Sequence, residues 1–406
     1  MRFAFVTTEL PLTKPHGGGS GTYVTRMTAL LAGAGHEVDI FIPVDVLKSH
    51  LQTDMDWNGC RVHHVRPRRS FLSRGVNGLL RTTGFGHLAM KRYWLARARA
   101  IGKAIERIHA RTGFDVVHSG DSYGIGLGVV ARPGRLFVIR CSAAIDLYLK
   151  SDGQNGRQAQ IRIDLEETLV QRADYAFAPS LLTARHYSQK LGIDVAVLPT
   201  PVYAEIAADG LVPPGTPLRY LLHFANDLSP RKGTDLVAAA LPLAVAQSPR
   251  LTMIWVGRID ETQRKRLLVQ LGSAADRVVF LPRQEKAVLY SLIRSAVCSV
   301  LPSRIDNLPN AVLESLMLGV PVIGTRESSI EELVEDGVTG VLIENGSVPE
   351  LAAAMAGAWQ ATLGWQPFEP WEKTTIGRVF APEAALAAYL DAIAIARRAQ
   401  PKDTST

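Results

Sequence analysis

One stretch, residues 306–325, constrains the chain more than any other part of the sequence. It reads DNLPNAVLESLMLG followed by VPVIGT, which predicts a loop, a helix, a turn and a buried strand. Asn307 is a suitable N-cap, Pro309 is tolerated in a first helical turn, and Gly319 suits the position just after the helix. Between residues 311 and 318 only a glutamate and a serine are polar, so we expect the helix to be buried on most sides.

Two acids in this stretch are candidates for a functional site. Asp306 precedes the predicted helix, and Glu314 lies eight residues further along, inside it. A buried carboxylate is costly unless a partner compensates its charge. The free N–H groups and dipole of a helix N-terminus favour a bound anion. The alternative is structural: a loop acid that caps the helix and a glutamate that is salt-bridged in the core. The coincidence of acid, cap and apolar run favours the functional interpretation.

The spelling and spacing of this stretch resemble the Glu-x7-Glu signature of the retaining glycosyltransferases of family 4, which have the GT-B fold. Asp306 stands where the family usually has a glutamate, so its side chain reaches about one methylene less far. The resemblance implies that Asp306 contacts hydroxyls of the donor sugar and that Glu314 contacts the ribose of the nucleotide. It also places Asn307, Leu308 and Asn310 along the nucleotide sugar.

A glycine-rich segment follows the first predicted strand, residues 2–7. The order strand, glycine loop (residues 16–22), helix, strand predicts a parallel, doubly wound sheet. Glycines let backbone N–H groups approach a phosphate, although a flexible loop is the alternative. In the resembled family a Gly-Gly pair, matched here by Gly18 and Gly19 with Ser20 beside them, lies against the donor diphosphate and the acceptor.

A second strand and glycine loop, residues 114–126, carries the candidate residues of the acceptor side. Family members often read Asp-Val-Val-His-x-His here, with the second histidine near the reacting sugar. His118 matches the first histidine, Gly120 stands at the position of the second, and Asp121 is a candidate to compensate for its loss. An ordinary strand-end role for His118 is the alternative.

The second half of the chain adds candidate cations. Arg231 and Lys232 precede a glycine and a predicted helix, where two cations oppose the helix dipole unless an anion lies between them. The resemblance places Lys232 on the donor diphosphate. The family's partner arginine is Asp227 in this chain, and we infer that Arg231 replaces it; a solvated basic turn is the alternative. Arg283 follows a buried strand where family members contact the base through backbone groups.

The chain is long enough for two domains, each with its own core. The predicted class is α/β, and the resemblance specifies a GT-B fold of two Rossmann-like, doubly wound domains facing a cleft. Five prolines between residues 199 and 217 indicate an interdomain linker. We expect four segments: an acceptor-side domain at 1–200, a linker at 201–217, a nucleotide-sugar-binding domain at 218–380, and at 381–406 a helix that crosses back to the first domain, plus a tail.

Composition predicts a cytosolic protein. No apolar run approaches the ~18 residues that a membrane helix needs, and Glu9 comes too early for a signal peptide. Cys60, Cys141 and Cys298 are far apart, with no C-x-x-C pair, which is typical of core thiols in a reducing compartment. Peripheral association with the cytoplasmic face of a membrane stays open.

The basic residues are concentrated in the first half of the chain. Residues 1–200 hold 26 Lys and Arg against 16 Asp and Glu, whereas residues 201–406 hold 19 against 22. Between Arg61 and Arg111 there are 13 basic residues and one acid. This asymmetry suggests an anionic partner, and the segment 66–75 adds a polybasic loop for membrane contact. A solvated basic face is an equal alternative. Nucleic acid is not expected, since no binding motif accompanies the charge.

The sequence therefore predicts a retaining glycosyltransferase. It would move a hexose-type sugar from a UDP- or GDP-linked donor to a hydroxyl of a glycan, a lipid-linked acceptor or a small molecule. Asp306, Lys232 and Arg231 are the candidate catalytic residues. The sequence has no cluster with metal-ligand spacing, so we expect neither a metal nor a prosthetic group. Two alternatives stay open: another GT-B enzyme, such as a nucleotide-sugar epimerase or a phosphorylase, and a non-catalytic nucleotide-sugar-binding subunit. Asp306, Asp227 and Gly120 depart from the family pattern and leave room for the latter.

Overall fold

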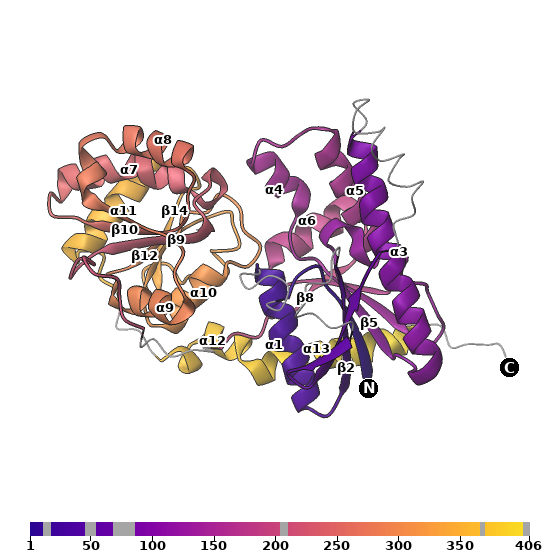
Figure 1. The fold of residues 1–406 in the computed structure, drawn as a ribbon. Coiled ribbons are helices and arrows are strands. Elements are labelled where there is room, and N and C mark those ends of the chain that lie inside the picture. Colours follow the sequence, from indigo (N-terminus) through magenta and orange to yellow (C-terminus); the bar gives the residue numbers. More distant parts are fainter. Residues whose placement is uncertain (11–17, 45–53, 68–85, 204–209, 366–369, 401–406) are drawn as a thin grey trace. The chain divides into compact units, whose positions relative to one another are not determined.

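The chain folds into two compact units (Figure 1). The computed structural model describes residues 1–10, 18–44, 54–67, 86–203, 210–365 and 370–400, and it leaves the side chain of Asp227 undescribed. The first unit comprises Met1–Pro201 and Pro382–Thr406, and the second comprises Val202–Ala381. Most of the expected linker therefore belongs to the second unit, where Val202 is buried and its N–H donates to the carbonyl of Phe380 at 2.9 Å.

A sheet in the order β3-β4-β2-β1-β5-β6-β7-β8 forms the centre of the first unit. Its described strands are parallel except β3, which runs antiparallel to β4. Short apolar runs, each followed by a loop and in most cases a helix, dictate this parallel arrangement. The strands are β1 Arg2–Val6, β2 Glu37–Pro43, β3 Asp54–Trp57, β4 Cys60–Val65, β5 Val116–Gly120, β6 Leu136–Arg140, β7 Tyr175–Ala178 and β8 Val195–Val197.

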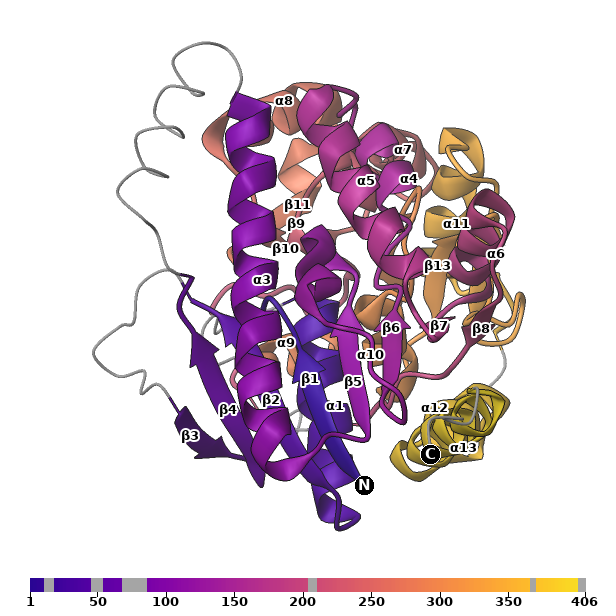
Figure 2. The same cartoon turned by 90° about the vertical axis from the view of Figure 1, so that its right-hand side faces the viewer.

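Helices cover both faces of this sheet (Figure 2). One face packs against α1 and α13, and the other packs against α3, α5, α6 and the short helix η1. The helix of the basic segment, α3, packs on the sheet through an apolar stripe that includes the buried Ala98, Ile101 and Ile105. The helices are α1 Gly19–Gly33, α3 Gly86–Thr112, η1 Ser122–Gly128, α4 Ile145–Ser151, α5 Arg157–Gln171, α6 Leu181–Leu191 and α13 Pro382–Ala399.

The last helix, α13, packs onto the first unit although it follows the second in sequence. Tyr389 and Ile393 of α13 join the core cluster that contains Phe3 and Tyr23. The Tyr389 hydroxyl lies 2.9 Å from Nδ1 of the buried His118. These contacts attach the end of the chain to the face of the sheet that α1 covers.

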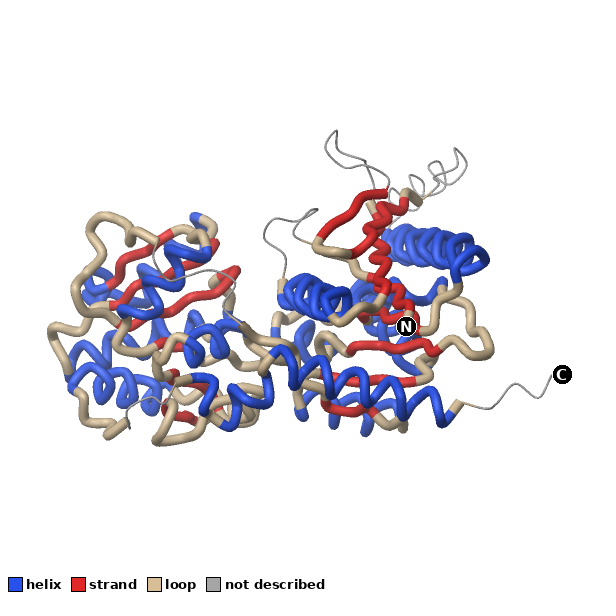
Figure 3. The backbone as a smooth tube through the Cα atoms, turned by 90° about the horizontal axis from the view of Figure 1, so that it is seen from below, coloured by secondary structure: helices blue, strands red, loops and turns tan. Residues whose placement is uncertain are grey.

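The second unit is built on a parallel sheet in the order β11-β10-β9-β12-β13-β14, enclosed by helices (Figure 3). Its strands are β9 Leu221–Asp227, β10 Met253–Arg258, β11 Val278–Leu281, β12 Ser299–Val300, β13 Val322–Thr325 and β14 Gly340–Ile343. Its helices are η2 Pro230–Lys232, α7 Thr234–Gln247, α8 Glu261–Leu271, η3 Gly272–Arg277, α9 Lys286–Ser295, α10 Asn310–Met317, α11 Val348–Gln360, η4 Trp371–Lys373 and α12 Thr375–Phe380.

The predicted helix of the central stretch is present as α10, but the expected N-cap is wrong. Pro309, not Asn307, is the N-cap, and its carbonyl accepts the N–H of Val312 at 3.0 Å. A residue that precedes proline is disfavoured in the helical region, so the helix cannot begin before Pro309. The predicted end is confirmed: Gly319 is left-handed, and the N–H of Val320 donates to the carbonyl of Ser315 at 2.9 Å, as in a Schellman motif.

The close approach of α3 to η1 yields a stability prediction. A Cβ added at Gly102 of α3 would lie 1.8 Å from the carbonyl oxygen of Gly128, whereas one at Gly33 of α1 would meet nothing within 4 Å. Gly102→Ala must therefore push η1 away from α3, and such overpacking costs about 1–3 kcal/mol. Urea unfolding should show a lower midpoint for Gly102→Ala and an unchanged or slightly higher one for the control, Gly33→Ala. Equal midpoints would contradict the packing described.

Candidate functional site

The strand order of the second unit reverses at β9, which marks a candidate binding position at the carboxyl ends of its central strands. The chain proceeds from β9 to β10 and β11 on one side, and β12, β13 and β14 lie on the other side of β9. In open parallel sheets, ligands bind outside the carboxyl ends of the strands where the order reverses in this way. Lys232 follows β9 and Asp306 follows β12, so the topology brings these two predicted residues to the same edge.

An ion pair joins the two residues. The Lys232 ammonium contacts the carboxylate of Asp306, which is 7% exposed. The other carboxylate oxygen accepts the N–H of Asn307 at 3.2 Å, and the Asp306 carbonyl accepts the hydroxyl of Ser329 at 2.8 Å. A nearly buried carboxylate needs such compensation. The negative charge expected beside Lys232 is therefore provided by the carboxylate of Asp306.

Gly233 allows the turn that carries Arg231 and Lys232 to lie against the chain that leaves β12. Its φ is +74°, and an added Cβ would lie 2.0 Å from the carbonyl oxygen of Pro302. Both the left-handed backbone and the close approach require glycine. The half-buried Arg231 lies in this turn, and its carbonyl accepts the N–H of Arg304 at 2.9 Å.

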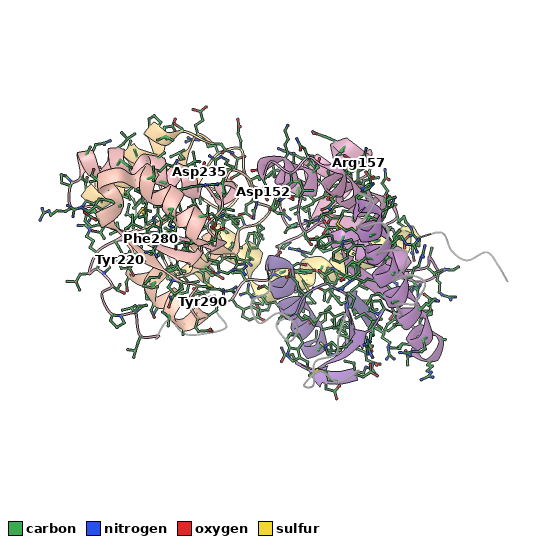
Figure 4. The ribbon with its side chains drawn as sticks, turned by 45° about the horizontal axis from the view of Figure 1, so that its top comes forward. Asp152, Arg157, Tyr220, Asp235, Phe280 and Tyr290 are labelled. Atoms are coloured by element: carbon green, nitrogen blue, oxygen red, sulfur yellow. The ribbon has the colours of Figure 1, made fainter. Side chains whose placement is uncertain are left out.

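Arg304 fixes the same two segments through its side chain. Its guanidinium donates to both carboxylate oxygens of Asp235, at 2.6 and 2.7 Å. Asp235 lies in the first turn of α7, where a carboxylate also complements the helix dipole (Figure 4). The loop that bears Asp306 is therefore clamped to the helix that follows Lys232.

Glu314 lies in α10 and is also paired. Its side chain is 11% exposed and forms an ion pair with Lys286, the first residue of α9, whose ammonium lies 5.2 Å from the ring centroid of Tyr290. Sequence analysis did not single out Lys286. The pair spans 28 residues between two helices, and no local pattern indicates such a contact.

The other predicted residues of this unit lie along the same loops. Asn307 is buried, Leu308 packs against the core, and Asn310 begins α10. Arg283 follows β11 and is half-buried; burial, and then the charge of Arg258, lower the pKa of its guanidinium.

His223 in β9 connects the segments that carry Lys232 and Asp306, and no sequence pattern indicated this role. Its Nδ1 lies 2.7 Å from the carbonyl oxygen of Val300, so Nδ1 must carry the proton and donate it. Its Nε2 lies 2.9 Å from the Thr234 hydroxyl and accepts from it. This neutral imidazole ties β9 to β12 and to the start of α7. Burial lowers its pKa to about 4.

In the first unit, the predicted glycines lie at the equivalent edge, where the strand order reverses between β1 and β5. Gly18 is the N-cap of α1 and donates its N–H to a carboxylate oxygen of Glu9 at 3.2 Å, and Gly19 and Ser20 form the first turn. The helix begins earlier than the predicted residue 23, because these glycines adopt helical backbone. Residues 11–17 lie outside the described part of the chain.

The two acceptor-side candidates, His118 and Asp121, differ in their surroundings. His118 is 1% exposed, stacks on Phe5 with ring centroids 4.4 Å apart, and has a pKa that burial lowers to about 3. Its side chain therefore presents no surface to an acceptor. Asp121 directly follows β5, is also 1% exposed, and accepts the N–H of Ser142 at 2.8 Å. Burial raises its pKa to about 6 against the opposing hydrogen bonds from Ser142.

The polybasic loop predicted for membrane contact lies mostly outside the described residues, which resume at Gly86. The helix that follows it, α3, exposes Arg92, Arg99 and Lys103. None of the described helices is both long and apolar enough to span a bilayer. Within the described residues, no group of three or more His, Cys, Asp or Glu is placed to hold a metal ion.

The buried histidine yields a pH prediction. An unfolded histidine titrates near 6.5, whereas His223 in the folded protein titrates near 4. Below about pH 6.5 the unfolded state therefore binds more protons, and the free energy of unfolding falls as the pH drops toward 4, by up to roughly 3 kcal/mol for this group. His223→Gln removes the titrating group, so its unfolding free energy should fall less between pH 7 and 4. Identical pH slopes for both proteins would contradict this account.

Comparison with known proteins places the chain in a family. Residues 18–202 match the model of a glycosyl transferase 4-like domain, and residues 219–360 match the model of glycosyl transferases group 1. The chain is 26% identical over 343 residues to a phosphatidyl-myo-inositol mannosyltransferase of Mycolicibacterium smegmatis, covering 84% of this chain and 81% of that protein. It is 27% identical over 402 residues to a D-inositol 3-phosphate glycosyltransferase of Nocardiopsis dassonvillei, covering 87% of this chain and 89% of that protein.

Solved structures agree on the fold. HepE from Anabaena, in complex with UDP and glucose, superposes with a TM-score of 0.68 over 97% of this chain and 100% of that chain, at 16% identity. Sucrose-phosphate synthase from Thermosynechococcus elongatus gives 0.63 over 97% of this chain and 96% of that chain, at 19% identity. With two matching domain models that span most of its length, the chain belongs to family 4 of the glycosyltransferases and has their GT-B fold.

Proposed function

We propose that this protein is a retaining, metal-independent glycosyltransferase that moves a hexose from a UDP- or GDP-linked donor to an acceptor hydroxyl. The observation that carries the proposal is the ion pair between Lys232 and Asp306, which lies where the strand order of the second unit reverses. A cation for a diphosphate and an acid for sugar hydroxyls stand there side by side, and Glu314 follows in the next helix.

Donor binding would exchange partners without leaving a charge uncompensated. Asp306 would exchange the Lys232 ammonium for hydroxyls of the sugar, and Lys232 would then contact the diphosphate together with Arg231. Glu314 would exchange Lys286 for the ribose hydroxyls. Each buried carboxylate thus keeps hydrogen-bond donors before and after binding, which avoids the large cost of an isolated buried charge.

The transfer step follows from this placement. The bond between the anomeric carbon and the diphosphate oxygen breaks, and the acceptor oxygen bonds to the same face of that carbon. The departing phosphate oxygen takes the acceptor's proton. Negative charge grows on the diphosphate during this step, so a fixed ammonium at Lys232 stabilises the transition state more than the ground state. The two-carboxylate scheme of glycoside hydrolysis does not fit, because Glu314 belongs to the ribose.

The acceptor would lie near Gly18, Gly19 and Ser20, and the buried Asp121 would support this position by holding the N–H of Ser142. Two of the relatives are named for inositol-containing acceptors, which supports a polyhydroxylated acceptor for this chain as well. An epimerase or a phosphorylase would instead turn the donor over without a second sugar acceptor, so the acceptor dependence of turnover discriminates among these activities.

Lys232→Ala should lower turnover more than donor affinity. Loss of an electrostatic group that acts in the transition state costs roughly 10²-fold or more in kcat. Steady-state kinetics provide the test, with Lys265→Ala as a control, because Lys265 is an exposed lysine of α8 whose side chain is 74% exposed. A near-normal kcat with only a raised KM would show that Lys232 merely binds the ground-state donor.

The two acids should fail in different ways. Glu314→Gln keeps the side-chain volume but loses the charge, so both free nucleotide diphosphate and nucleotide sugar should bind about ten- to a hundredfold more weakly. Asp306→Asn should leave free-nucleotide binding nearly unchanged and reduce transfer, because only the sugar contacts it. Calorimetry with both ligands on both variants is the measurement. Loss of free-nucleotide binding in Asp306→Asn alone would contradict the placement of the donor.

We also propose that the basic first unit contacts anionic lipid peripherally. Each cation near an anionic bilayer contributes about 1 kcal/mol, so replacing three should weaken binding roughly a hundredfold. The variant replaces three of the exposed cations of α3 with alanine: Arg92, Arg99 and Lys103. Its charge-matched control replaces three exposed cations of the second unit: Arg250, Lys265 and Arg266. Flotation with anionic and neutral vesicles is the measurement, and equal binding to both would rule out the electrostatic contact.

A further inference from the structure

The first unit contains a buried guanidinium without a carboxylate partner. Arg140 is 6% exposed, and its Nε has no hydrogen-bond partner. Its terminal nitrogens donate to the hydroxyls of Thr200 at 3.2 Å and Ser142 at 3.4 Å. No carboxylate in the described part of the chain forms an ion pair with it. Arg135, which is similarly buried, instead pairs with Glu106 at 2.7 Å.

This arrangement is unusual because buried charges are normally paired or bind a ligand. The guanidinium stacks over the Tyr23 ring, 4.2 Å from its centroid, which compensates the charge only in part. Asp121 is the acid whose charge acts on it, but that carboxylate is held by the N–H of Ser142 at 2.8 Å. Arg140 therefore retains donors that no protein group uses.

The position of Arg140 is that of a ligand-binding residue. It ends β6 and is in register with Gly120, the last residue of β5, and β5 borders the point where the strand order reverses. Register partners in adjacent parallel strands present their Cβ atoms to the same face. That face is the one covered by α1, since the Arg140 guanidinium stacks on Tyr23 of that helix.

Gly120 leaves room beside the guanidinium. A Cβ added there would meet only two atoms within 4 Å, the hydroxyl oxygens of Ser20 and Ser142, each at 3.8 Å. Ser20, Gly120 and Ser142 are all partly exposed, so solvent reaches this position. The first turn of α1 also contributes its dipole, which favours an anion.

We propose that the acceptor carries a phosphate group and that Arg140 binds it, with the hydroxyls of Ser20 and Ser142 as further donors. The proposal rests on the proposed function in placing the acceptor at this edge, and it specifies the chemical class of that acceptor. A planar guanidinium matches the geometry of phosphate oxygens, and Gly120 leaves the space that the group needs. A soluble sugar phosphate and a phospholipid headgroup share this chemistry.

The test reads Arg140 directly through NMR of the arginine Nε–H groups in the full chain. The resonance that disappears in Arg140→Met is assigned to Arg140 and followed while inorganic phosphate is added. We expect a saturable shift with phosphate and none with glucose. Because the local resonance is observed, phosphate bound near Lys232 in the second unit does not enter the measurement. The absence of a phosphate-dependent shift would overturn the proposal.

Binding measurements separate this role from a structural one. With glucose 6-phosphate, and with vesicles that contain phosphatidylinositol, Arg140→Met should bind about ten- to a hundredfold more weakly than the wild type and Arg140→Lys should lie between them. Thr200→Val removes only the hydrogen bond between the Arg140 guanidinium and the Thr200 hydroxyl, and this variant should bind both probes normally. Tighter binding of one probe identifies the source of the phosphate. If Thr200→Val lost binding as Arg140→Met did, the role would be structural and the proposal wrong.

The outcomes also separate this inference from the proposed function. Nucleotide diphosphate binding, which depends on the second unit, should be unchanged in Arg140→Met. A protein that binds phosphate through Arg140 but transfers no sugar would refute the proposed activity alone. A protein that transfers sugar equally well with Arg140→Met to a phosphorylated acceptor would refute the role of Arg140 alone.

Discussion

The ion pair between Lys232 and Asp306 is the interaction on which the second unit's functional edge depends. It exists because β9 and β12 are neighbours although 71 residues lie between the last residue of β9, Asp227, and the first residue of β12, Ser299. Gly233 lets the turn after β9 lie against the chain after β12, and Arg304 clamps that chain to α7 through Asp235. The neutral imidazole of His223 in β9 bonds to the carbonyl of Val300 at the end of β12 and to the hydroxyl of Thr234 at the start of α7. Together these contacts hold the segments that carry the two charges next to each other.

The same constraint, that a buried charge needs a partner, explains why both acids of the site are paired with lysines. Asp306 pairs with Lys232 and Glu314 pairs with Lys286, so each nearly buried carboxylate has a cationic partner within the protein. A nucleotide sugar offers hydroxyls to the acids and a diphosphate to the cation. Under the proposed function, binding exchanges these partners, and its free energy is the difference between the two sets of interactions.

Local patterns predicted those features that local chemistry determines. The apolar run and Gly319 predicted α10 and its end, because a helix terminus is set by residues within one turn. The strand, glycine loop and helix after Arg2 predicted the first α/β unit of the parallel sheet. The start of α10 was misjudged, because the restriction that Pro309 imposes on the preceding residue outweighs a good capping side chain at Asn307.

Long-range contacts were beyond the sequence patterns. Lys286 and His223 join segments that are distant in the chain, and neither has a local signature. His118 matched a family motif, yet its side chain is enclosed by Phe5, Tyr23 and Tyr389, the last of which comes from the other end of the chain. No sequence pattern indicated a role for Arg140 for the same reason: that its guanidinium lacks a carboxylate partner is known only once the strands are placed side by side.

The most direct measurement of the central claim is a crystal structure of the protein with a bound nucleotide sugar. The account predicts the diphosphate within hydrogen-bonding distance of the Lys232 ammonium, the ribose hydroxyls on the Glu314 carboxylate, and Lys232 and Asp306 no longer in contact. A nucleotide bound elsewhere, or one bound with the Lys232–Asp306 pair intact, would contradict it.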